Sequence, residues 1–503
     1  MERRFKAGET LIMKRSSAFL FGGEVTRRNF LKQTALASGA IGMGAWSARR
    51  AGAKPTLKAA ALPDPGQSGI EHIIVVMMEN RSFDHFLGWL PNADGKQSNL
   101  SYPDKNNILQ PTYALAPDFQ GCGHPSPDHS YAGGRIEYNG GACDGWLKAG
   151  QNDLFSIGYY KQADLSFLGA AAPAWTVCDN YFAAIMSETF PNRIYQHAAQ
   201  TDRLENTFDA CSLPTIWDRL SDASVSRRYY FSDIPMIALW GAKYLPITRK
   251  ISTFYDDCAN DTLPAVSYVD PRFFDENLGT SGDDHPHADI RNGEEFLNKV
   301  YAAVTTSPAW SKTVLVINYD EWGGFFDHVA PPTAAIPAAD AAAGNADGRL
   351  GFRVPCLVIS PWSRRGFVAK GLYDHTSILK MIEWRWNLPS LTVRDTNANN
   401  LAETLDFSTV NLTAPVFAVP AGPFGGPCLD KIELGRTDNG FSIKWPTGGS
   451  LESATNVTGP WIRVTNAANP YVIQGTNSLE FFRVPEEWAP LAKLARSFGF
   501  TTD

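Results

Sequence analysis

The stretch EHIIVVMMENRSFDHFLGWLP, from Glu71 to Pro91, is the strongest indication of the fold in this chain. Its apolar run, Ile73 to Met78, carries no charge and is bounded by polar residues. Such a run is typical of a strand buried on both faces, as in a parallel sheet that helices cover. Glu79 and Asn80 follow at the strand end where open α/β sheets bind ligands. Their oxygens suit a hard cation, although a helix cap at Asn80 or Ser82 explains the same pattern.

A second apolar run lies in TVLVINYDEWGGFFDHVAPP, residues 313–332, and is followed by Asp320 and Glu321. Neighbouring strand residues point to opposite faces, so both carboxylates reach one ion only if the chain turns there. Gly323 and Gly324 permit such a turn. The alternative is a solvated pair of carboxylates in a loop.

Thr189 stands near the start of an expected helix, because Pro191 suits the first helical turn. Free backbone amides and the positive end of the helix dipole at that position would hold a phosphate. From the residues alone, Thr189 as a simple helix cap is the alternative.

Several of these segments together resemble one family. VVMMENRSFDHFLG (75–88), NGG-x-x-D-G (139–145), TFPNR (189–193) and YDEWGGFFDHV (319–329) are similar to motifs of the bacterial phosphoesterase family. That family holds phosphatidylcholine-type phospholipases C and periplasmic acid phosphatases, within the alkaline-phosphatase-like superfamily. The resemblance spans residues 65–425 and implies a three-layer α/β/α catalytic domain.

The resemblance also implies roles for individual residues. Thr189 matches the nucleophile, with Ser187 as the fallback, and a hydroxyl needs a metal ion to react at neutral pH. His129 and His285 match the catalytic histidines, with His124 and His287 as their alternatives. The expected metal ligands are Glu79, Asn80, Thr189, Asp320 and Glu321, and the expected substrate-binding residues are Asn80, His287 and His328. Asp327 and His328 have an alternative role in fixing their loop, and His375 is expected to be structural.

The ligand set consists mainly of oxygens, which favours calcium, magnesium or manganese, with zinc as a further option. The expected function is an exported metal-dependent phosphoesterase that cleaves phospholipid phosphodiesters, as phospholipase C does. An acid phosphatase acting on phosphomonoesters is the first alternative. A non-catalytic envelope-binding protein is the alternative of another class, and it predicts gaps among the acidic ligands or at the nucleophile.

Charge is distributed unevenly along the 503 residues. Residues 1–61 hold 12 Lys/Arg and three Asp/Glu, whereas the whole chain has a net charge of -7. The acidic body argues against nucleic acid as a partner. TRRNFLK, residues 26–32, followed by a short apolar run, resembles a twin-arginine export signal. We therefore expect a signal and linker over 1–61, contact with the export machinery, a periplasmic or secreted protein, and peripheral contact with a membrane.

Seven cysteines and the C-terminal region complete the expectations. An exported chain permits disulfides, and Cys122 with Cys143 is the expected pair, with buried single thiols as the alternative. No CxxC occurs, which disfavours a thiolate zinc site. Residues 428–490 alternate short β-rich runs with Gly, Asn and Pro, and they predict a small β module. Its role is either surface binding or purely structural.

Overall fold

The computed structural model describes residues 61–426 and short stretches between 428 and 499. The centre is an eight-stranded sheet with the order β13-β6-β12-β11-β1-β10-β8-β9. Its strands are β1 (His72–Met78), β6 (Thr176–Cys178), β8 (Arg227–Phe231), β9 (Thr248–Lys250), β10 (Val266–Asp270), β11 (Thr313–Tyr319), β12 (Cys356–Ile359) and β13 (Phe367–Ala369). The three-layer α/β/α fold expected from the sequence is therefore confirmed.

The two strands predicted from apolar runs lie side by side at the centre of the sheet. β1 and β11 pair in parallel from His72 opposite Thr313 to Met78 opposite Tyr319. Every residue of β11 is buried, and so are Ile73 to Met78. β12 runs antiparallel to both β11 and β6, so the sheet is mixed. A buried apolar strand has the same composition in either direction, which is why the sequence did not indicate the reversal.

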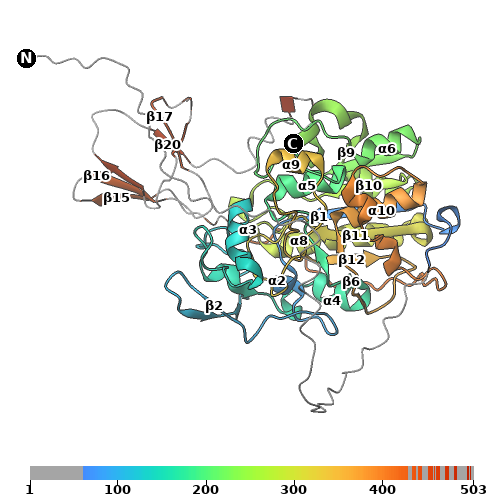
Figure 1. Ribbon diagram of the computed structural model, residues 1–503, viewed down its shortest axis with the longest axis horizontal. Helices are drawn as coiled ribbons and strands as arrows, with labels where there is room; N and C mark the ends of the chain where they lie inside the picture. The colour runs from blue at the N-terminus through green and yellow to red at the C-terminus, as the bar shows by residue number, and fades with distance from the viewer. Residues whose placement is uncertain are drawn as a thin grey trace, which may run out of the picture. The chain divides into compact units, whose positions relative to one another are not determined.

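Helices cover both faces of the sheet (Figure 1). α5, α10 and α11 pack together, and α7 packs with α8. The helix bounds are α2 (Phe83–Leu87), α3 (Tyr131–Tyr138), α4 (Leu168–Ala174), α5 (Thr189–Ala198), α6 (Ile216–Asp222), α7 (Ile251–Ala259), α8 (Ile290–Thr306), α9 (Ala338–Ala343), α10 (His375–Trp386) and α11 (Val393–Asn397). Among the residues that the structure describes, none of the helices has the length and apolar character needed to span a bilayer.

Three small two-stranded sheets support the loops around the main sheet. They pair β2 (Ser101–Pro103) with β3 (Leu109–Pro111), β4 (Tyr113–Ala114) with β5 (Gly158–Tyr159), and β7 (Tyr181–Phe182) with β14 (Tyr373–Asp374). The Ala-rich segment 334–348 contains α9. Its buried Asp340 accepts hydrogen bonds from the Tyr195 hydroxyl and the Thr201 amide, which fixes the segment to the domain.

The C-terminal region forms two three-stranded antiparallel sheets, β15-β16-β19 and β18-β17-β20. The strands are β15 (Glu433–Thr437), β16 (Gly440–Lys444), β17 (Glu452–Ala454), β18 (Ile462–Arg463), β19 (Tyr471–Gln474) and β20 (Phe481–Arg483). Ile443 and Leu451 are buried in a small core of their own. The expected twin-arginine signal lies in residues 1–60, outside the described part of the chain.

Candidate active site

The ends of β1 and β11 bring the two predicted acidic segments together. Because Met78 pairs with Tyr319, Glu79 and Asp320 leave the sheet at neighbouring positions. The backbone amides of Asn80 and Glu321 both donate to Asp320 Oδ1, at 3.1 and 2.7 Å. Asn80 adopts a left-handed φ of 57°, a conformation that non-glycine residues hold at a cost and that is concentrated at functional sites.

The turn expected after Glu321 is present. Gly323 and Gly324 have φ values of 63° and 69°, which suit glycine. A Cβ atom at Gly323 would lie 2.2 Å from the Asn80 carbonyl oxygen, so a side chain does not fit there. The amide of Gly323 donates to Glu321 Oε2 at 2.6 Å. The turn therefore fixes the Glu321 carboxylate at the same sheet edge as Glu79.

Helix α5 brings the predicted nucleophile to these carboxylates. Thr189 is its first residue, is 2% exposed, and donates from Oγ1 to Glu79 Oε1 at 3.1 Å. The free backbone amides expected at this helix end are absent from the two residues that follow Thr189. The Phe190 amide donates to Asn206 Oδ1, and Pro191 has no amide hydrogen. The helix end thus contributes its dipole more than a set of amide donors.

Arg193 is a site residue that we did not single out from the sequence. It lies four residues after Thr189, on the same face of α5, and is 2% exposed. Its Nη2 is 2.8 Å from Glu79 Oε2, and its Nε is 3.0 Å from Asp320 Oδ2. Nη2 also donates to the Met78 carbonyl at 3.1 Å. The guanidinium therefore joins the ends of both strands to the helix that carries Thr189.

The electrostatics of this cluster favour a cation. Burial raises the pKa of Glu79 well above its ordinary value, and the negative charge of Asp320 adds to the rise while Arg193 opposes it. Burial and the Asp320 charge likewise raise the pKa of Glu321. Burial raises the pKa of Asp320, and Arg193 again opposes it. Crowded buried carboxylates of this kind are stabilised by protons or by positive charge.

Unpartnered oxygens indicate where a metal ion fits. Asn80 Oδ1 and Glu321 Oε1 are buried and have no hydrogen-bond partner. Buried polar atoms are nearly always satisfied, so such atoms need an explanation. Together with Glu79 and Thr189, which contact each other, they are the oxygen-rich candidates for metal ligands at the ends of β1 and β11. Asp320 fits less well as a direct ligand, since its two oxygens already accept two amides and Arg193.

His328 lies in a different cluster from the one predicted. Asp84, Asp327 and His328 place ligand atoms within 4.8 Å of one another. Arg353 fills the space between the carboxylates, with Nε 2.9 Å from Asp327 Oδ1 and Nη2 3.1 Å from Asp84 Oδ1. A guanidinium thus supplies the positive charge of this cluster. The place of His328 in this cluster favours its alternative role, which is to fix the loop after β11.

Two of the predicted histidines adjoin the Glu79 cluster. His129 Nε2 is 3.4 Å from Asn80 Nδ2 and 4.0 Å from Glu321 Oε1. His285 is buried, and its charge lowers the pKa of both Glu79 and Glu321. His287 makes a hydrogen bond through Nε2 to the His124 carbonyl at 2.9 Å.

His124, the alternative to His129, pairs with Asp153 at 2.8 Å and stacks on Phe155. His129 therefore lies at the site, and the loop of His285 is bonded to the end of β1 through the Asp283 carbonyl, whereas His124 and His287 make loop contacts.

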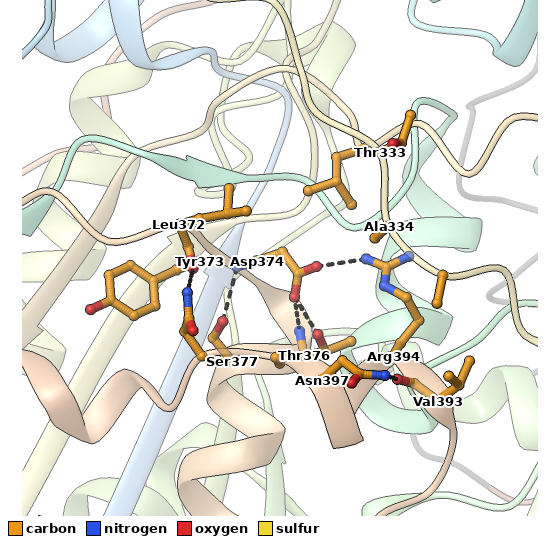
Figure 2. A pocket seen from close by; sticks show the side chains of 14 residues that line it. Thr333, Ala334, Leu372, Tyr373, Asp374, Thr376, Ser377, Val393, Arg394 and Asn397 are labelled. Atoms are coloured by element: carbon orange, nitrogen blue, oxygen red, sulfur yellow. Dashed lines mark hydrogen bonds and ion pairs between the residues drawn. The ribbon is translucent and has the colours of Figure 1, made fainter. Parts of the chain in front are cut away.

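His375 has a supporting position, as expected. Burial lowers the pKa of His375 to about 4, so the ring is neutral, and its Nε2 donates to the Asp320 carbonyl at 2.7 Å. The preceding residue, Asp374, caps α10 and pairs with Arg394 at 2.6 Å. Figure 2 shows this pair on the wall of a cavity of about 210 Å³ that Thr333 also lines. The buried ion pair fixes the helix that holds His375 against Asp320.

The disulfide prediction was wrong. Cys122 bonds to Cys428, 306 residues away, and Cys143 is a buried free thiol. The Gln120 side chain also donates to the Gly426 carbonyl. The segment before the β module is therefore attached to the loop that leads to His129. Disulfide connectivity depends on the tertiary fold, and short sequence spacing is a poor guide to it.

Several known proteins are similar to this chain. Among solved structures, a protein in the alkaline phosphatase superfamily from Vibrio parahaemolyticus aligns over 78% of each chain, with 9% identity and a TM-score of 0.33. Phospholipase C A of Mycobacterium tuberculosis is 29% identical over 86% of this chain and 97% of its own length. Phospholipase C B of the same organism is 32% identical over 76% and 86%.

Non-specific phospholipase C6 of Arabidopsis thaliana is 31% identical over 70% of this chain and 75% of that protein. The model of the Phosphoesterase family matches residues 70–389, which is more than half of the chain. The chain therefore belongs to the Phosphoesterase family and is a phosphoric ester hydrolase.

Proposed function

We propose that this chain is a metal-dependent phospholipase C, which cleaves a phospholipid phosphodiester with Thr189 as the nucleophile. The observation that carries the proposal is the contact of 3.1 Å between Thr189 Oγ1 and Glu79 Oε1, beside two unpartnered buried oxygens. The named relatives are phospholipases C, which favours phosphodiesters over phosphomonoesters. An acid phosphatase is the second candidate, supported by the family resemblance alone.

Glu79, Asn80 and Glu321 would hold the metal ion, with Thr189 beside them and Asp320 close behind. Their oxygens suit calcium, magnesium or manganese better than zinc. A divalent cation bound there lowers the pKa of a neighbouring hydroxyl and polarises a phosphoryl oxygen. The chain's own contribution is to fix Thr189 Oγ1 against Glu79, which orients the oxygen and accepts its hydrogen bond.

The reaction then has two halves. Thr189 Oγ attacks phosphorus as its proton passes to Glu79, and the bond from phosphorus to the glycerol oxygen breaks, with its electron pair going to that oxygen. A histidine beside the site, His129 or His285, gives the leaving oxygen a proton, and diacylglycerol departs. Water then attacks the phosphothreonine and gives a proton to the same histidine. The bond from phosphorus to Thr189 Oγ breaks, Glu79 returns the proton to Oγ, and the phosphorylated head group leaves.

Export is part of the proposal, and one structural feature supports it. Disulfides persist in oxidising compartments and are rare in the cytosol. The bond between Cys122 and Cys428 joins two segments of the described chain, so it is part of the folded protein. Together with the twin-arginine pattern at residues 26–32, it supports a periplasmic or secreted location.

The test is turnover of paired substrates by matched variants. Thr189→Ala should lose at least about a thousand-fold in kcat, because a nucleophile is removed, and should keep its melting temperature. Thr189→Ser keeps the hydroxyl and is the control, expected to retain measurable turnover. Removal of metal by a chelator should abolish activity, and adding back a divalent ion should restore it.

The product distinguishes the two enzyme candidates. Phosphocholine released from phosphatidylcholine supports phospholipase C, whereas phosphate released only from monoesters supports the phosphatase. Unchanged turnover in Thr189→Ala, or in the chelated protein, would contradict the catalytic role proposed for the site.

A further inference from the structure

His285 has a carboxylate partner that the sequence did not indicate. Its Nδ1 is 3.1 Å from Glu276 Oε2, and the same nitrogen is 3.0 Å from the Pro286 carbonyl oxygen. Glu276 and His285 are both at least 90% buried. A carbonyl oxygen, like an ionised carboxylate, only accepts hydrogen bonds, so Nδ1 carries a proton in the neutral ring as well as in the charged ring. Nε2 is therefore the nitrogen that gains or loses a proton.

The position of the loop relates this nitrogen to the proposed site. The Glu79 amide donates to the Asp283 carbonyl at 2.9 Å, which ties the His285 loop to the end of β1. The charge of His285 is felt at Glu79 and Glu321, on two different strand ends, and at Asp283. These three groups are carboxyl groups, and negative charge on them favours positive charge nearby.

His129 lacks this arrangement. Its Nδ1 lies 2.9 Å from the Pro127 carbonyl, which fixes the same tautomer with a neutral acceptor. Its Nε2 faces the amide nitrogen of Asn80 at 3.4 Å and Glu321 Oε1 at 4.0 Å. A carboxylate stabilises an imidazolium more strongly than a carbonyl does, because charge-assisted hydrogen bonds are roughly twice as strong. The structure therefore distinguishes two histidines that the sequence left equivalent.

We propose that Glu276 is a positioning residue that orients His285 and stabilises its charged form, so that His285 is the general acid for the leaving alcohol. The inference rests on the proposed function and deepens it. As the bond from phosphorus to the glycerol oxygen breaks, the oxygen takes the electron pair and the Nε2 proton. Neutral His285 then accepts a proton from the water that attacks phosphothreonine, so the ring ends each cycle charged again. His129 keeps the role of a fixed contact near Asn80.

The test compares two leaving groups in Glu276→Gln, which removes the charge and keeps the shape. The first substrate is phosphatidylcholine in mixed micelles, whose alkoxide needs a proton in order to leave. The second is p-nitrophenylphosphocholine, whose aryl oxide leaves without one. General acid catalysis contributes about 100- to 10,000-fold, so we expect a loss of at least about 10-fold in kcat for the phospholipid and under about 3-fold for the aryl ester.

The pH profile is the second readout. Without the Glu276 carboxylate the charged ring is less stable, so the basic limb of kcat/KM for the phospholipid should move to lower pH by about one unit. Glu276→Asp keeps the charge and should hold the limb nearer its wild-type position. Glu295→Gln, which removes the pair of half-buried Glu295 with exposed Lys299 on α8, is the matched control and should not change the turnover of either substrate.

The outcomes separate this inference from the proposed function. Equal losses on both substrates with an unmoved pH profile would make Glu276 merely structural and overturn the inference, as would full phospholipase activity in Glu276→Gln. Wild-type aryl hydrolysis by Thr189→Ala would instead overturn the nucleophile. If Glu276→Gln does not fold, the pH profiles of the wild type still test whether a general acid acts. A basic limb of equal size for the phospholipid and the aryl ester would overturn the inference.

Discussion

Replacing Arg193 with methionine should destabilise the protein strongly, because the guanidinium pairs closely with two buried carboxylates and lies 3.9 Å from a third, that of Asp270. Its nitrogens lie 2.8 Å from Glu79 and 3.0 Å from Asp320, and none of the three side chains is more than 2% exposed. Methionine fills similar space with no charge. The substitution therefore leaves two carboxylates in the core without their positive partner.

The contacts give the size of the effect. Opposite charges about 4 Å apart attract by about 4 kcal/mol at an effective dielectric constant of about 20, before the cost of desolvation. Removal of one partner from a buried pair typically costs about 3–5 kcal/mol. Because Arg193 serves two carboxylates, we expect a loss of about 5 kcal/mol in the free energy of unfolding at pH 8.

The loss should depend on pH, and its sign follows from the pKa shifts. Burial raises the pKa values of Glu79 and Asp320, and Arg193 lowers both. Without Arg193 the folded chain holds protons that the unfolded chain releases, so the variant loses stability as the pH rises. The deficit should therefore be smaller at pH 5.5 than at pH 8, by at least about 1.4 kcal/mol for a shift of one pKa unit.

Urea unfolding in a chelating buffer at the two pH values measures both quantities. Lys312→Met is the control, since Lys312 and Glu71 form an exposed pair whose loss should cost at most about 1 kcal/mol. A deficit below about 1 kcal/mol for Arg193→Met, or one equal at both pH values, would refute the reasoning. The first result would mean that the carboxylates do not need the guanidinium, and the second that they do not take up protons in its absence.

Two further predictions concern the rest of the fold. Burial raises the pKa of Glu383 from 4.5 to about 10, and Asp395 adds to the rise. Between these two pH values the folded chain therefore keeps a proton that the unfolded chain has released. Because of Glu383, the free energy of unfolding should fall by up to about 1.4 kcal/mol per pH unit between pH 6 and 8, and Glu383→Gln should remove this part of the fall. An unchanged slope would contradict the prediction. Serine at Cys122 and Cys428 together should cost about 2–5 kcal/mol in urea unfolding, because the disulfide closes a loop of 306 residues. An unaltered midpoint would show that the link adds no stability.

The fold was predictable because its signals are local and redundant. Two uncharged apolar runs, each followed by carboxylates, predicted the central strands β1 and β11, and strand length fixed where they end. Parallel strands that end together place Glu79 beside Asp320 without any further information. The sequence also carried a signal for Arg193 that we did not use. Residues four apart share a helix face, so a helix that presents Thr189 to the site presents Arg193 to it as well.

The remaining contacts depend on the tertiary fold alone. Glu276 begins a 3₁₀ turn of three residues after β10, Glu276–Leu278, which is too short for a periodicity that would orient its side chain, and its contact with His285 depends on the tertiary fold. The partner of Cys122 follows from the return of the chain after α11, which no spacing rule anticipates. Local propensity therefore specifies the elements of this site, and packing specifies which polar groups complete it.

The two histidines of the 283–289 loop illustrate why residue types did not separate the roles. In an extended chain, residues two apart point to the same side, so His285 and His287 would face one site together. Instead, Asp284 and His287 adopt left-handed φ values of 79° and 81°, although neither is glycine. Such conformations cost about 1–3 kcal/mol each and persist where surrounding contacts enforce them. Here the His287 amide donates to the Gln120 carbonyl, and its ring reaches the His124 carbonyl. The backbone thus turns His287 toward the loop that the disulfide holds, and it leaves His285 paired with Glu276.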